Sequence, residues 1–120
     1  MSHLLPTQAS VFVTGRTSDI GSTTLLTAPA NGLYRVSVYL VDAAADLTAG
    51  AVTAAIAYTD RVQAQTLVTS AMALTTLGAF IQTSWFIQAK SGTTISYSTS
   101  HTGILGSASY DIYLAVERLS

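Results

Sequence analysis

The sequence predicts an all-β fold: a two-sheet, antiparallel jelly-roll sandwich of about eight strands with an N-terminal arm. Short segments that alternate apolar and polar residues recur along the chain, and turn-forming residues separate them. Ser, Thr and Ala are abundant, and Thr joins Val, Ile and Tyr in favouring a half-buried pleated surface. No long helical pattern interrupts this series. An immunoglobulin-like sandwich is the alternative fold.

The 120 residues are enough for one domain. We divide it into residues 1–30, an arm with the first short strands, and residues 31–120, the jelly-roll core. Residues 1–8 show no period and contain Pro6, so they are expected to form the arm. Residues 9–14 and 23–27 are the first predicted strands.

The clearest strand of the sequence follows the turn at Asn31-Gly32 and covers residues 33–41. Its alternation places four residues on one face, namely Tyr34, Val36, Val38 and Leu40. Residues 42–50 are expected to form a loop with room for one helical turn, because the three alanines there are flanked by Asp and Gly. Residues 51–59 alternate again, and residues 63–68 and 70–74 are two further short strands.

Residues 77–89 carry apolar side chains on both faces, which is typical of a strand buried on both sides. Phe80 and Phe86 share one face, and the other face holds Ile81, Trp85 and Ile87. A turn at residues 90–93 leads into a strand at 94–98, and residues 99–107 are expected to form a loop. The last predicted strand, residues 108–119, alternates over its whole length and is therefore expected inside a sheet.

Charged residues are unusually scarce in this chain, and their scarcity excludes several classes of partner. Charged residues make up 9% of the sequence, the net charge is −1, and there is no Cys. Without a basic field we expect no nucleic acid among the partners, and without an apolar run of about 18 residues we expect no membrane partner. A soluble monomer normally carries more surface charge, so we expect much of this surface to be covered by copies of the chain or by a partner. A neutral, Ser- and Thr-coated monomer is the alternative.

No catalytic or cofactor site is expected, and we predict that the protein is not an enzyme. Residues 11–21 resemble the opening of short-chain dehydrogenases, but Asp19 stands where the middle glycine belongs, and no Tyr-x-x-x-Lys pair follows. His3 and His101 lack the Asp and Ser neighbours of a hydrolytic triad. Three acidic residues do not have the spacing of a calcium loop, namely Asp42, Asp46 and Asp60. Hence no metal is expected.

Aromatic side chains offer one further possibility, a platform for stacking sugars. The candidates are Tyr39, Tyr58, Trp85, Tyr97 and Tyr113. Most of these residues occupy alternating strand positions, so packing in the core or between subunits is the favoured interpretation.

Two segments resemble the tumour-necrosis-factor-like class of compact jelly rolls: residues 32–39, Gly-Leu-Tyr-Arg-Val-Ser-Val-Tyr, and residues 110–117, Tyr-Asp-Ile-Tyr-Leu-Ala-Val-Glu. In that class the matching strands lie in the inner sheet near a threefold axis. Residues 30–119 are also similar to small phage virion proteins, with two further motifs in the same order at residues 54–60 and 91–99. The resemblance implies a homotrimer that serves as a capsid decoration, a head fibre or a tail-tip domain.

We therefore expect a trimeric capsid decoration (cement) protein that binds the major capsid protein on the outer surface of a phage head. The alternative is a receptor- or glycan-binding tip domain of a tail or head fibre, and a host-derived trimeric ligand is a weaker third possibility. The expected capsid-contact arm contains Leu4, Leu5 and Pro6. The expected trimer interface contains Phe80, Trp85, Phe86, Tyr113 and Ala115.

Overall fold

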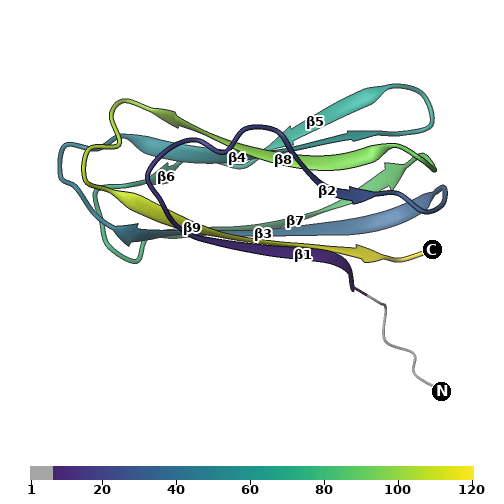
Figure 1. Cartoon of the computed structure of the whole chain (residues 1–120), viewed down its shortest axis with the longest axis horizontal. Helices are drawn as coiled ribbons and strands as arrows, with labels where there is room; N and C mark the ends of the chain where they lie inside the picture. Colours follow the sequence, from purple (N-terminus) through teal and green to yellow (C-terminus); the bar gives the residue numbers. More distant parts are fainter. Residues whose placement is uncertain (1–6) are drawn as a thin grey trace, which may run out of the picture.

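The computed structural model describes residues 7–120, which form a sandwich of two antiparallel sheets (Figure 1). The first sheet has the order β1-β9-β3-β7, with β1 at Thr7–Arg16, β9 at Ser109–Arg118, β3 at Gly32–Ala44 and β7 at Phe80–Ala89. The second has the order β2-β8-β4-β5, with β2 at Thr23–Thr27, β8 at Thr94–Thr102, β4 at Ala51–Thr59 and β5 at Ala64–Val68; β6, at Met72–Ala73, pairs with β4. The predicted two-sheet, antiparallel, all-β architecture is confirmed.

The strand boundaries differ from the prediction in three places. The segment expected as a loop with one helical turn begins as strand, because β3 continues to Ala44 and pairs there with Ser109 of β9. The second expected loop is also partly strand, since β8 continues to Thr102 opposite Ala51. The strand expected at residues 70–74 shrinks to the two residues of β6. In each case pairing with a distant strand decides the boundary, and the local sequence does not.

The core lies between the sheets and is built from the inward positions of alternating strands. In β3 the four residues predicted to share a face are all buried. The facing positions of β4 are the buried residues Val52, Ala54 and Ile56. Because each strand buries every second residue, its other residues form the two outer faces of the sandwich.

The first two predicted strands lie at edges of the sandwich. β1 pairs with β9 in the first sheet, and β2 pairs with β8 in the second. The expected contact residues Leu4, Leu5 and Pro6 lie outside the described residues. Thr7, at the start of β1, stands opposite Glu117, so β1 begins at the end of the sandwich where β9 finishes (Figure 1).

A buried tyrosine joins the two sheets by hydrogen bonds. The Tyr110 hydroxyl lies 2.6 Å from Thr99 Oγ1 and donates to the Ser18 carbonyl at 2.7 Å. Thr99 Oγ1 in turn accepts from the backbone N–H of Ile20 at 2.8 Å. Burial raises the pKa of Tyr110, so the hydroxyl stays protonated and available as a donor. This series of hydrogen bonds holds the connection between β1 and β2 against the core.

Candidate functional site

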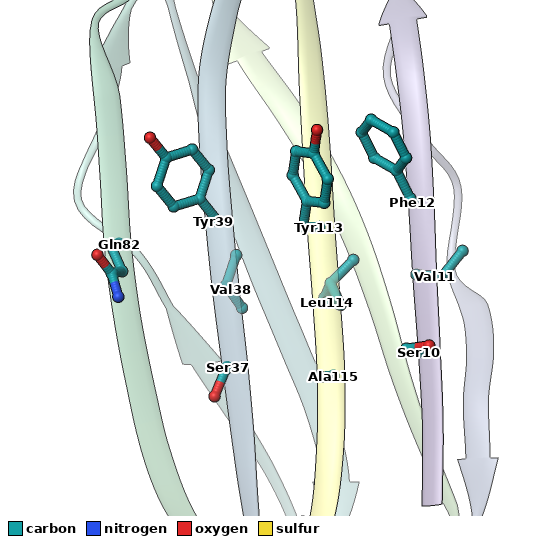
Figure 2. A pocket seen from close by; sticks show the side chains of 10 residues that line it. All are labelled: Ser10, Val11, Phe12, Ser37, Val38, Tyr39, Gln82, Tyr113, Leu114 and Ala115. Carbon is teal, nitrogen blue, oxygen red and sulfur yellow. The ribbon is translucent and has the colours of Figure 1, made fainter. Parts of the chain in front are cut away.

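Four aromatic side chains form a row across the outer face of the first sheet. We call Phe12, Tyr113, Tyr39 and Phe80 the aromatic row; they come from β1, β9, β3 and β7 in that order. The Phe12 and Tyr113 rings stack with centroids 3.7 Å apart, and Tyr39 and Phe80 stack at 5.5 Å. Tyr39 meets Tyr113 edge-on at 6.0 Å. Figure 2 shows three of these rings standing side by side on their strands.

The aromatic row is unusually exposed for such apolar groups. Phe12 is 53% exposed, Tyr113 42% and Phe80 57%. Monomeric proteins rarely expose contiguous apolar patches of this kind, and larger patches usually mark interaction surfaces. The row is therefore the candidate functional surface of this chain.

A strip of small side chains runs beside the aromatic row. This small-residue row consists of Ser10, Ala115, Ser37 and Ser84, which lie opposite one another on the same four strands. Next to the rings it leaves a depression of about 380 Å³, lined by residues that Figure 2 labels, among them Ser37, Gln82 and Ala115. A second, more polar depression of about 500 Å³ adjoins it and is lined by Arg35, Ser37, Gln82, Thr83 and Ser84. The aromatic row thus forms a ridge on this face, and the two depressions form a groove alongside it.

An ion pair closes the far side of this groove. Arg35 of β3 and Glu117 of β9 stand opposite each other, and Arg35 Nε donates to Glu117 Oε1 at 3.0 Å. Both side chains are only partly exposed. Phe86 of β7 stands opposite Arg35 and is 66% exposed, so apolar surface continues past the ion pair to the sheet edge.

The structure brings four of the five predicted interface residues to this face. Phe80, Phe86, Tyr113 and Ala115 all occupy outward positions of the first sheet. Trp85 does not, because it has the opposite parity on β7 and packs against the core. The structure thus separates Trp85 from the other predicted interface residues.

Phe12 and Tyr39 also belong to this surface, although neither is among the predicted interface residues. Both were readable from strand parity, since Phe12 alternates with the inward Val11 and Val13, and Tyr39 alternates with Val38 and Leu40. What the sequence lacks is the strand order, which places β1, β9 and β3 side by side.

Three of the five candidates for a sugar platform belong to the core. Tyr97 is buried, while Tyr58 and Trp85 pack against the core cluster. Tyr39 and Tyr113 remain, and both belong to the aromatic row.

The described residues hold no group of three His, Asp or Glu side chains that could bind a metal ion. His101 lies on β8, where its Nδ1 is 2.6 Å from Asp19 Oδ1 in the connection between β1 and β2. Within residues 7–120 no helix is long and apolar enough to cross a membrane.

No protein-family model matches the sequence, and no curated protein matches it significantly. Solved structures do share the fold. The PRD1 vertex protein P5 aligns with a TM-score of 0.58 and 13% identity, covering 96% of this chain and 99% of that one. The carbohydrate-binding module TmCBM61, solved with β-1,4-galactotriose, aligns with a TM-score of 0.55 and 12% identity over 94% of this chain and 67% of its own.

The VP2 protein of infectious bursal disease virus, solved as a subviral particle, aligns with a TM-score of 0.52 and 16% identity over 91% of this chain and 32% of its own. These likenesses establish the fold and leave the function to the site. The chain is a jelly-roll sandwich whose structural neighbours include viral capsid and vertex proteins and a carbohydrate-binding module.

Proposed function

We propose that this protein is a non-enzymatic structural subunit of a virion, a homotrimer that decorates the outer surface of a phage head and binds the major capsid protein. The observation that carries the proposal is the aromatic row, which crosses all four strands of the first sheet and is open to solvent in the single chain. A surface of this kind is stabilised when another protein surface covers it.

The geometry of the rings favours protein packing over sugar stacking. A sugar stacks on a ring whose face is open, but Phe12 and Tyr113 turn their faces toward each other with only 15° between their planes. Tyr39 and Phe80 do the same with 8° between theirs. A protein partner can instead pack against the edges of these stacked rings, as aromatic rings do in protein cores and interfaces.

The edge strand β7 supports a ring-shaped assembly. Its sequence, FIQTSWFIQA, contains no charged residue and no Pro, and its pairing with β3 has no register shift. Such an edge lacks the features that normally keep sheet edges from pairing, so we expect a neighbour to cover it. If the β7 edge of one copy packs on the aromatic row of the next, the contact is heterologous, and it forms a ring when the rotation from one copy to the next closes on itself. A trimer then follows from the resemblance to the tumour-necrosis-factor-like class.

Attachment to the capsid remains assigned to the arm. Leu4 and Leu5 precede Thr7, where β1 begins at the end of the sandwich that also holds the end of β9. Replacing either leucine with Asp is expected to weaken binding to empty capsids while the trimer stays intact. Unfolding of the trimer by Leu4→Asp or Leu5→Asp would contradict this assignment and place the arm in the core.

A matched pair of arginine substitutions tests the interface. Ala115 is a half-buried residue at the centre of the outer face of the first sheet, and Ala55 holds the same kind of position in β4 on the second sheet. We expect Ala115→Arg to give a folded monomer, because a trimer would have to bury an unpaired charge at each contact. We expect Ala55→Arg to leave the trimer unchanged. A trimeric Ala115→Arg variant would refute the assigned face.

The polar depression beside Tyr39 favours a second candidate function, oligosaccharide binding by a fibre tip domain. Arg35, Gln82 and Ser84 bring charged, amide and hydroxyl groups together there, which suits hydrogen bonding to sugars. The likeness to TmCBM61 is compatible with this candidate. Both functions need the same face, so they exclude each other. A monomer that binds an oligosaccharide and loses it with Gln82→Ala would favour the second candidate.

A further inference from the structure

Three loops at the end of the sandwich away from both termini are joined into one unit (Figure 1). They are residues 45–50 between β3 and β4, residues 74–79 between β6 and β7, and residues 103–108 between β8 and β9. Asp46 N donates to the Leu74 carbonyl at 3.1 Å, and Leu74 N to the Gly50 carbonyl at 3.0 Å. Gly50 N donates to the Ile104 carbonyl at 2.8 Å. Backbone contacts therefore hold the three loops against one another.

The Asp46 carboxylate fastens the first loop to the third. Its Oδ2 accepts from Ser107 N at 2.9 Å and Ser107 Oγ at 3.1 Å, while Oδ1 accepts from Thr48 N and Oγ1 at 2.9 and 2.8 Å. The chain passes so close that a Cβ on Gly106 would stand 2.3 Å from Oδ2. The Asp46 carboxylate, the one charged group in these three loops, is thus hydrogen-bonded within them on both of its oxygens.

Each of these tied loops nevertheless presents a large aliphatic side chain to solvent. Leu47 is 89% exposed, Leu77 69% and Ile104 56%. Side chains held out by an ordered backbone lose little entropy when a partner covers them, which is the arrangement of a preorganised contact surface. We call these three residues the tip cluster.

The chemistry around the tip cluster selects its partner. The three loops contain no Lys, Arg or His, so nothing there attracts phosphate or an anionic lipid. Three separate side chains also offer too little area for a standard protein interface, which buries about 800 Å² per partner. A fitting partner is therefore an uncharged layer into which single aliphatic side chains can insert. The interfacial region of a neutral phospholipid bilayer is such a layer.

We propose that the tip cluster inserts into the interfacial region of a neutral phospholipid bilayer, so that this end of the protein rests on a membrane surface. The lack of a long apolar run excludes a spanning segment only, and the fold brings together three residues that lie far apart in the sequence. The proposal does not depend on the trimer, although threefold repetition of the cluster would raise the avidity.

The experiment uses flotation of the full chain with large unilamellar phosphatidylcholine vesicles. We expect the wild type to float, and the triple variant Leu47→Ser, Leu77→Ser, Ile104→Ser to partition at least about tenfold more weakly. The matched control is Val62→Ser, because Val62 is 80% exposed in the turn between β4 and β5 at the opposite end. This variant is expected to float like the wild type, as is the wild type in about 0.5 M NaCl.

Four outcomes would overturn the proposal. The first two are that the wild type does not float, or that Val62→Ser loses flotation as much as the triple variant does. The other two are vesicle binding that needs added phosphatidylglycerol and disappears in salt, and capsid attachment that depends on the tip cluster without any flotation. The last outcome would identify a protein as the partner. Native mass measured on the same samples separates this proposal from the proposed function, since a monomer that floats refutes the trimer alone.

Discussion

Replacing Asp42 with Asn tests the packing of the core, because the carboxyl group of Asp42 is buried in it. Asp42 ends the inward series of β3, is 1% exposed, and has no hydrogen-bond partner for either carboxylate oxygen among the described residues. Burial raises its pKa, and the nearby backbone N–H of Ala44 offsets only part of the rise. Above that pKa the folded protein holds an uncompensated buried charge.

The sign of the effect follows from linkage. Because the folded state has the higher pKa, Asp42 favours folding most below the unfolded value of 3.8, and this contribution is lost as the pH rises through the folded pKa. An unpartnered buried charge costs at least about 1–3 kcal/mol, and Asn has the same shape without the charge. We therefore expect Asp42→Asn to raise the free energy of unfolding by about 1–3 kcal/mol at pH 8, and by about zero at pH 3 where Asp42 is protonated.

The assay is urea unfolding of both proteins from about pH 3 to 8, at one protein concentration because association affects apparent stability. Asp60 provides a control, because its contribution to stability changes with pH in the opposite direction. The backbone N–H groups of Gln63 and Val62 lower its pKa, so its contribution is present at neutral pH and lost as the pH falls. A difference between wild type and Asp42→Asn that does not change with pH, or a less stable variant at pH 8, would show that ionised Asp42 does not destabilise the folded state.

Three further substitutions test other parts of the fold. Tyr110→Phe should lower the free energy of unfolding by about 1–3 kcal/mol in urea titrations, because Thr99 and the Ser18 carbonyl lose their buried partner. Gly50→Ala should lower the melting temperature and remove the link between the tip loops, since its Cβ would stand 1.7 Å from the Thr102 carbonyl oxygen in the present backbone. Trp85→Ala should cost about 3 kcal/mol and leave the native mass unchanged, because the ring packs on the core.

Local alternation made much of the fold predictable. In β3 each inward residue is apolar up to Leu40, and the same rule located β4 and β9 within a residue or two. The grouping of the β7 residues by face was also correct, since Phe80 and Phe86 share one face and Ile87 lies on the other. The expected burial on both sides is not seen in the single chain, where β7 is an edge strand and both Phe side chains are exposed. Strand parity is a property of neighbouring residues, so a single sequence contains it.

Features that depend on pairing between distant segments could not be predicted in the same way. Residues 99–102 look like loop because they are polar, yet β8 continues through them where Ser100 and His101 meet Thr53 and Val52 of β4. Asp42 was placed in a loop because it flanks a short segment of three alanines, yet the β3–β9 ladder extends past it and pairs it with Tyr110. The aromatic row and the tip cluster depend on strand order and loop contacts in the same way.

The native mass of the wild-type protein shows whether copies of this chain cover the aromatic row. Sedimentation equilibrium at about 10 µM measures this mass without reference to shape. We expect a species of about 37 kDa, three times the chain mass of 12.5 kDa, at all accessible concentrations. A mass of 12.5 kDa that does not change with concentration would contradict this expectation.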